Sequence, residues 1–205
     1  MNILAIGAHP DDIEFGCGGT LIRYANAGHN IFIMVMTDGS VGGDPNKRKA
    51  EQEEAAKYLN AKKVFWGDYK DTQLMISKEL IIKVEAVISE VQPDLVLFNY
   101  LEDVHQDHRA TAKACLSATR YIKEVLYFEV PTTMNFVPDV FVDVRDVIDK
   151  KMELLRSHES QVNRTKVENL AITESSIACA TFRGYQARTR YAEGFKALRV
   201  LRGIC

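Results

Sequence analysis

The chain has 205 residues, of which 46% are hydrophobic and 26% charged, and its formal net charge is −2. This length fits one globular domain over residues 1–205, and the composition is that of an ordinary folded protein. The small net charge provides no global field for polyanions, so no nucleic-acid partner is expected. Met1–Gly7 lacks the features of a signal peptide and no apolar run approaches a membrane span, so we expect a cytoplasmic protein.

The cysteines are scattered along the chain and form no C-x-x-C pair: Cys17, Cys115, Cys179 and Cys205. This spacing predicts neither a zinc knuckle nor a redox motif. In a reducing compartment we expect all of them to be free thiols.

Strand and helix patterns alternate over the first two thirds of the sequence. Taken in chain order, we expect a strand at 2–7, a helix at about 16–26, a strand at 30–37, a helix at about 46–59 with Asn46 as N-cap, a strand at 63–67, a helix at 77–91, a strand at 95–100, a helix at about 105–121 and a strand at 125–130. Such alternation predicts right-handed βαβ units and a doubly wound α/β fold, in which helices flank a mostly parallel sheet.

The last third of the chain has a less regular pattern. It predicts a strand at 140–144, a helix at 147–156, a helical stretch at 165–180 and a terminal segment at 191–201. No linker or internal repeat separates this part from the rest, so we expect it to cap the sheet and line the site.

Two polar clusters follow strands of the expected sheet. His9-Pro10-Asp11-Asp12 comes directly after the first strand, and His105-Gln106-Asp107-His108 follows the fourth strand after a short loop. In the commonest doubly wound order these strands are neighbours across the point where strand order reverses, and ligands bind there. The two clusters should therefore face each other.

Imidazole nitrogens with a carboxylate oxygen form the usual ligand set of a catalytic zinc ion. His9 and Asp12 can come from one turn and His108 from the other loop, so we expect these three to be the metal ligands. Such a site would generate a hydrolytic nucleophile from water at neutral pH. Two histidines and one carboxylate with open positions also suit Fe²⁺, so the residues alone leave the metal open.

The remaining members of the clusters have roles around such a metal. Asp11 is the expected general base, which takes the proton of the attacking water and passes it to a leaving amine. His105 lies one helical turn before His108 and is expected, as an imidazolium, to stabilise the oxyanion. Asp107 would hold the ring of His105 and favour its charge.

Simpler interpretations exist for several of these residues. Asp11 and Asp12 can cap a helix, and the second cluster can be a solvated helix start. The Gly16-Cys17-Gly18-Gly19 stretch lacks the order of a dinucleotide-binding loop and is expected to allow close helix-to-strand packing. His29 is expected on the surface, and His158 as a cap or surface group.

These motifs resemble those of the LmbE-like (PIG-L) family of metal-dependent N-deacetylases. The specific part of the resemblance is the two histidine motifs, and supporting matches extend over nearly the whole chain: Gly7–Glu14, Gly16–Thr20, Thr37-Asp38-Gly39, Arg48 with Glu51, His105–Arg109, Ser157–Gln161 and Tyr191–Phe195.

The resemblance implies a Rossmann-like fold, usually with zinc, and a substrate carrying N-acetylglucosamine or a related amino sugar. By motif it implies His9, Asp12 and His108 as ligands, Asp11 as the base, and His105 as the oxyanion stabiliser oriented by Asp107. It further implies that Arg48 holds sugar hydroxyls and that Tyr191 lies near the site. Members of the family are often homo-oligomers, and nothing in this sequence specifies a number of subunits.

The sequence departs from the family pattern in two respects. The chain is short, and Arg188 follows Gln-Ala where the family has Gln-Ala-Gly before the terminal Tyr-Ala-Glu. We therefore expect a hydrolase that removes an acetyl group from an N-acetylated sugar conjugate, with the attached group undetermined. One alternative is a metal-dependent amidase on another acyl amide, such as a mycothiol- or bacillithiol-type conjugate. Another is a non-catalytic binding module of Rossmann type.

Overall fold

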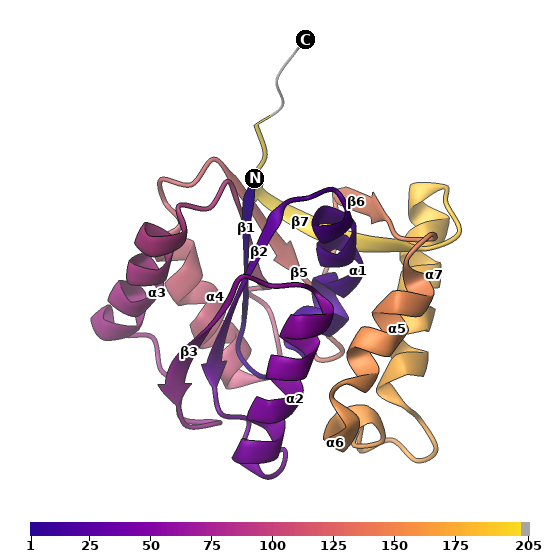
Figure 1. The fold of residues 1–205 in the computed structure, drawn as a ribbon, viewed down its shortest axis with the longest axis horizontal. Coiled ribbons are helices and arrows are strands. Elements are labelled where there is room, and N and C mark those ends of the chain that lie inside the picture. Colours follow the sequence, from indigo (N-terminus) through magenta and orange to yellow (C-terminus); the bar gives the residue numbers. More distant parts are fainter. Residues whose placement is uncertain (202–205) are drawn as a thin grey trace.

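The computed structural model describes residues 1–201 and contains one seven-stranded sheet between two layers of helices (Figure 1). The prediction for Cys205 lies outside the described residues. Cys17 and Cys115 are buried free thiols, and Cys179 is a half-buried one. Within residues 1–201, no helix is long and apolar enough to cross a membrane.

The strands and helices of the first two thirds alternate as expected. Their order is β1 (Asn2–Gly7), α1 (Asp12–Asn26), β2 (Asn30–Thr37), α2 (Pro45–Tyr58), β3 (Lys63–Tyr69), α3 (Lys78–Val91), β4 (Leu95–Asn99), α4 (Gln106–Ala118) and β5 (Glu124–Phe128). The later elements are β6 (Val140–Asp143), α5 (Ile148–Arg156), α6 (Glu159–Val162), α7 (Ile172–Ala187) and β7 (Ala192–Arg199).

The sheet has the strand order β3-β2-β1-β4-β5-β7-β6. Its first five strands are parallel, and β7 pairs antiparallel with both β5 and β6. The predicted doubly wound, mostly parallel α/β sheet is thus confirmed. Because β1 and β4 are neighbours, the strand order reverses between them, and the loops that follow these two strands meet at one edge of the sheet.

Each face of the sheet packs against its own set of helices. Alternate residues of β1 point to opposite faces, so Ile3 and Ala5 belong to a core with α1, α2, α5 and α7, whereas Leu4 and Ile6 pack with α3 and α4. Figure 1 shows the two helical layers on opposite sides of the strands. The central strands are consequently buried on both faces, which explains their continuous apolar runs.

The glycines of α1 allow this helix to lie close to the sheet. A Cβ atom on Gly16 would lie 2.7 Å from Cγ of buried Phe128, and one on Gly19 would lie 2.8 Å from Cγ1 of Val144. Both distances are too short for real side chains, so the close-packing interpretation of this glycine-rich stretch agrees with the structure.

Several element boundaries differ from the prediction, most of them by one to three residues. Helix α1 begins at Asp12 rather than near Gly16. Asp44, not Asn46, caps α2: the Asp44 carboxylate accepts a hydrogen bond from the Asn46 amide, and Pro45 occupies the first helical position.

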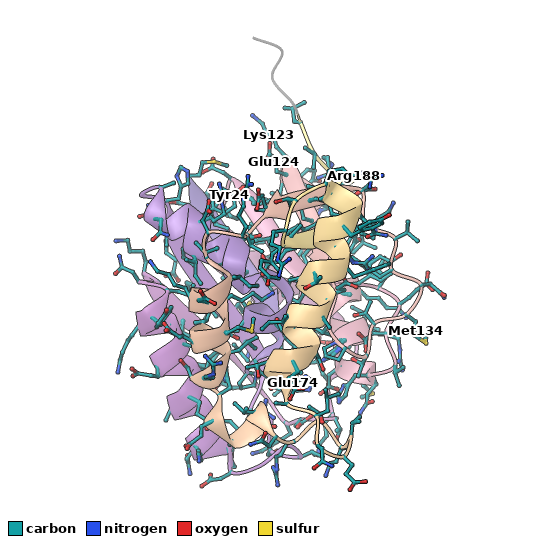
Figure 2. All side chains as sticks on the ribbon, turned by 90° about the vertical axis from the view of Figure 1, so that its right-hand side faces the viewer. Tyr24, Lys123, Glu124, Met134, Glu174 and Arg188 are labelled. Carbon is teal, nitrogen blue, oxygen red and sulfur yellow. The ribbon has the colours of Figure 1, made fainter. Side chains whose placement is uncertain are left out.

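The helix expected at 165–180 is shifted towards the C-terminus, to Ile172–Ala187. A side chain–backbone turn replaces the first part, because the Thr165 hydroxyl donates to the Leu170 carbonyl and accepts from the Val167 amide. Figure 2 shows α7 on the outer face of the molecule, between the labelled Glu174 and Arg188. Arg188 ends the helix in a left-handed conformation, with φ of 61°.

Candidate metal and active site

The site lies where the loops after β1 and β4 meet. His9 belongs to the loop between β1 and α1, and Asp12 is the first residue of α1. His105 caps α4, and Asp107 and His108 lie in its first turn. Two segments separated by almost a hundred residues in sequence are thereby brought into contact, as the sequence predicted.

Three donor atoms from these segments form a compact triangle. Nδ1 of His9 lies 3.1 Å from Nε2 of His108, and Oδ2 of Asp12 lies 3.6 Å and 3.3 Å from these two nitrogens. Ligands bound to zinc at about 2.0–2.1 Å in a tetrahedron stand roughly 3.3–3.4 Å apart. The His9, Asp12 and His108 donor set therefore fits a tetrahedral metal ion with one position left for a substrate or water.

The backbone and Asn99 fix the position of the Asp12 carboxylate. Its Oδ2 accepts hydrogen bonds from the amides of Ala8 and His9, each at 3.0 Å, and from Nδ2 of Asn99 at 3.3 Å. Burial raises the pKa of Asp12, but the neighbouring His108 and His9 outweigh it and hold this pKa well below the ordinary value. Asp12 is consequently ionised at neutral pH.

Each of the two ligand histidines turns its second ring nitrogen towards carboxylates. Nε2 of His9 lies 3.1 Å from Asp71 and 3.2 Å from Asp107, and Nδ1 of His108 lies 3.1 Å from Asp103. Such outer carboxylates fix the ring orientation and the tautomer of metal-binding histidines. This arrangement is a second observation of the structure that fits a metal ion.

Asp71 and Asp103 were not predicted as site residues, although their positions after two strands could have indicated them. Asp71 follows the end of β3 and Asp103 lies in the loop after β4, so both stand at the carboxyl ends of parallel strands, where ligand sites are built. Neither lies in a recognisable histidine motif.

Asp107 contacts a different histidine from the one expected. Its carboxylate lies beside His9 and accepts hydrogen bonds from the Thr72 amide at 2.7 Å and the Leu74 amide at 3.3 Å. It contacts His105 through its backbone instead, because the Asp107 amide donates to Nδ1 of His105. The first turn of α4 carries the Asp107 side chain away from the ring that caps the helix.

His105 is expected to be neutral rather than an imidazolium. Burial and the nearby His9 and His108 lower its pKa, and the opposing effect of Asp107 is smaller. With the Asp107 amide donating to Nδ1, the neutral ring carries its proton on Nε2. His105 can then stabilise an oxyanion as a hydrogen-bond donor.

Asp11 precedes α1 in a left-handed conformation, with φ of 97°. A non-glycine residue in this region is uncommon, and such strain concentrates at functional sites. Asp11 lines the same cavity as His9, Asp12 and His108. Burial raises the pKa of Asp11, and Arg48, whose Nη2 lies 3.3 Å from Oδ2 of Asp11, opposes this effect.

Arg48 of α2 is buried and holds Asp11 in place. It donates to the carbonyls of Pro10 and Gly39 as well as to Asp11. The glycine-rich loop after β2 is folded around it, because a Cβ on Gly39 would lie 2.8 Å from Cζ of Arg48. Arg48 also lines the cavity, as a residue for sugar hydroxyls would.

A cavity of about 370 Å³ opens over the metal triangle. Its floor contains His9, Asp11, Asp12, His105 and His108, and its walls contain Phe15, Val41, Gly42, Arg48, Asp71, Val130, Pro131, Thr132, Arg164, Lys166 and Ile172. This volume lies in the range of about 300–1,000 Å³ that is typical of small-molecule sites.

Tyr191 does not line this cavity, contrary to expectation. Its carbonyl accepts from the amide of Val144, and the neighbouring Asp143 carbonyl accepts from Arg23. Arg23 is eleven residues along α1 from Asp12, a distance of about 16 Å at 1.5 Å per residue. The antiparallel β6–β7 pair crosses α1 in its later turns and places Tyr191 there.

His29 is half-buried rather than exposed, and His158 is not the cap or surface group that was expected. It is 1% exposed, and its Nε2 lies 3.2 Å from Oε2 of the fully buried Glu14. The other Glu14 oxygen accepts from Gln52 at 2.7 Å. These contacts of Glu14 join α1, α2 and the residue that precedes α6.

Comparison with known proteins agrees with this geometry. Residues 4–119 match the family PIG-L, GlcNAc-PI de-N-acetylase. The chain is 37% identical over 167 residues to the uncharacterized deacetylase YaiS of Escherichia coli, covering 77% of this chain and 90% of that protein. It also resembles the structure of N,N'-diacetylchitobiose deacetylase from Pyrococcus horikoshii, with a TM-score of 0.84 and 26% identity over 96% of this chain and 83% of the other.

The fold is also shared with an enzyme of another class. GalB, the 4-carboxy-2-hydroxymuconate hydratase of Pseudomonas putida, has a TM-score of 0.82 and 23% identity, covering 100% of this chain and 99% of that one. The fold alone does not decide the reaction, whereas the family match and the YaiS similarity do bear on it. The chain therefore belongs to the PIG-L family and is a deacetylase, a hydrolase that acts on amides.

Proposed function

We propose that the chain is a zinc-dependent hydrolase that removes the acetyl group from an N-acetylated amino sugar, of the N-acetylglucosamine type, and releases acetate and a free amine. The observation that carries this proposal is the triangle of His9, Asp12 and His108, with Asp11 beside it at the floor of the cavity. These residues supply a metal site and a base within one small-molecule pocket.

A bound zinc ion supplies a Lewis acid that brings the pKa of water to about 7 and polarises the acyl oxygen. The protein residues complete the reaction. Asp11 takes a proton from the attacking water, whose oxygen forms a bond with the acetyl carbon. Asp11 then gives this proton to the amide nitrogen as the carbon–nitrogen bond breaks, and the amine leaves.

The oxyanion that develops on the acyl group needs a hydrogen-bond donor. His105 lines the cavity and carries its proton on Nε2, because its Nδ1 is occupied by the Asp107 amide. A neutral imidazole donates such a bond without first having to be protonated. His105 therefore acts over a wider pH range than an imidazolium with a lowered pKa would.

The cavity walls offer both apolar and polar surface to a sugar. Val41, Val130 and Ile172 provide apolar surface, whereas Arg48 and Asp71 provide polar groups near the floor. The structurally similar P. horikoshii enzyme is named for diacetylchitobiose, a disaccharide of N-acetylated amino sugars. We therefore propose N-acetyl amino-sugar conjugates as the substrate class of this chain.

The experiment is an assay of amine and acetate release from a panel of N-acetylglucosamine conjugates by the zinc-loaded and the iron-loaded protein. N-acetylated amino acids and N-acetylcysteine conjugates serve as the competing amides. A preference for the sugar conjugates supports the proposal, and a preference for the other amides redirects it to a different acyl substrate. Zinc binding without any amide cleavage would contradict the enzymatic assignment and favour a binding module.

A further inference from the structure

We propose that the substrate carries an anionic group, a carboxylate or a phosphate, in addition to its N-acetyl amino sugar, and that Arg164 and Lys166 bind this group at the mouth of the cavity. This inference rests on the proposed function and specifies its substrate class. Both residues line the cavity and belong to the loop between α6 and α7.

The acidic residues of the cavity already have partners. Asp11 lies against Arg48, and Asp12 lies between the two ligand histidines. Asp71 lies beside His9. The negative charge at the floor is therefore compensated locally, and it is not available to neutralise cations at the mouth.

Arg164 and Lys166 have no such partners. Both side chains are exposed, and neither forms an ion pair with any carboxylate among residues 1–201. Because both cations line one cavity, an anion bound there would gain attraction from each of them.

The loop that carries these cations is fastened over the site. Nε2 of Gln161 donates to the Gly42 carbonyl at 3.2 Å, and a Cβ on Gly43 would lie 3.0 Å from Nη1 of Arg164. The Arg164 guanidinium thus packs against the turn that forms one wall of the cavity. This contact holds the guanidinium at the cavity.

The chemistry of the two side chains favours an oxyanion over a neutral group. The planar guanidinium of Arg164 can donate two parallel hydrogen bonds to a carboxylate or a phosphate, and the Lys166 ammonium adds a second positive charge. The same cavity is also lined by the apolar residues Val41, Val130 and Ile172. A cationic substituent would be repelled from the same position.

The test compares three compounds: methyl N-acetylglucosaminide, N-acetylglucosamine 1-phosphate and the N-acetylglucosaminide of glycolic acid. We expect a higher kcat/KM for at least one anionic compound than for the neutral one. This advantage of the anionic compound should fall as salt is added. In R164Q/K166Q, the anionic-to-neutral ratio of kcat/KM should fall about tenfold, since charge-assisted bonds at exposed positions contribute modestly. The stronger of the two anionic compounds identifies the group as phosphate or carboxylate.

The double variant K113Q/R156Q is the matched control, because it removes the same two charges from exposed positions that do not line the cavity. Its ratio should equal that of the wild type. An equal loss in both double variants, or a wild-type ratio near one, would overturn the inference while leaving the proposed function intact.

Calorimetric binding of the same compounds separates the two proposals. If none of them is deacetylated, the proposed function fails for this sugar. The anion site still stands if the anionic compounds bind more tightly than the neutral one in the wild type and lose this advantage in R164Q/K166Q. Equal dissociation constants for all three compounds would overturn it.

Discussion

The Asp107 carboxylate lies 3.2 Å from Nε2 of His9, on the side of the ring opposite the nitrogen that faces Asp12 and His108. Asp103 stands in the same relation to His108, at 3.1 Å from Nδ1. Both histidines of the proposed metal site are thus oriented from behind by buried carboxylates. The Asp107 carboxylate therefore acts on the proposed metal site through His9, and not on the oxyanion through His105.

The variant D107N should bind zinc about 10–100-fold more weakly than the wild type, because it removes the charge that orients His9 and raises its basicity. At saturating zinc, kcat should recover most of its wild-type value. Competition with a chromophoric chelator measures the affinity. Unchanged zinc affinity with a persistent loss of kcat would instead assign the Asp107 carboxylate to His105.

The variant R48Q should move the acidic limb of the kcat/KM profile to higher pH. Burial raises the pKa of Asp11 and Arg48 opposes this, so removing the cation raises the pKa further and the base is protonated over a wider acidic range. The measurement is a pH–rate profile with zinc in excess. The neighbouring variant K47Q also loses one charge from α2, but Lys47 pairs with Glu159 and Glu51 and should leave the limb in place. If the acidic limb of the kcat/KM profile stays at the same pH in R48Q, the pairing of Arg48 with Asp11 is contradicted.

Zinc uptake by the metal-free protein should release protons at neutral pH. Burial lowers the pKa of His108, but Asp12 and Asp103 outweigh it and raise this pKa to about 9. Burial also lowers the pKa of His9, but Asp107, Asp12 and Asp71 outweigh it and raise this pKa well above its ordinary value. The metal requires neutral rings, so below pH of about 9 zinc affinity should fall by about tenfold per pH unit for each displaced proton. Calorimetry in buffers of different ionisation enthalpy counts the protons. Zinc binding at pH 7 without proton release would contradict this assignment.

The variant G16A should destabilise the protein by about 1–3 kcal/mol or more, because its methyl group would overlap the buried ring of Phe128. The variant G18A in the same helix is the control. Its Cβ would lie 3.0 Å from the end of the flexible Leu154 side chain, and alanine favours the helix over glycine by about 1 kcal/mol. Urea unfolding measures both. Equal free energies of unfolding for the two variants would contradict the close packing of α1 on β5.

The sequence was sufficient to predict the sheet and the contact between the two histidine motifs of the site. Continuous apolar runs predicted the buried parallel strands, and the strand order then brought His9 opposite His108. Local sequence patterns predicted less well those segments whose conformation depends on tertiary contacts. Thr165 turns the chain before α7, which no periodicity reveals, and β7 places Tyr191 beside the later turns of α1 rather than at the cavity.

Single polar residues were the hardest to assign from sequence. His158 is buried because Glu14, far away in the sequence, provides its partner. Asp71 stands outside both histidine motifs, yet the end of β3 brings it to His9. In each case the role depends on a long-range contact and not on neighbours in the chain.

The proposed function is that one zinc ion, with Asp11 as base, deacetylates an amino sugar. Its most direct test is amine release from an N-acetylglucosamine conjugate during zinc titration of chelated wild-type protein and of D11N, because asparagine tolerates the left-handed conformation of residue 11. We predict that about one zinc per chain restores the wild type, and that D11N binds the same zinc with kcat lower by about 10²–10⁴-fold. Full amine release by chelated protein, or by zinc-loaded D11N, would contradict the account.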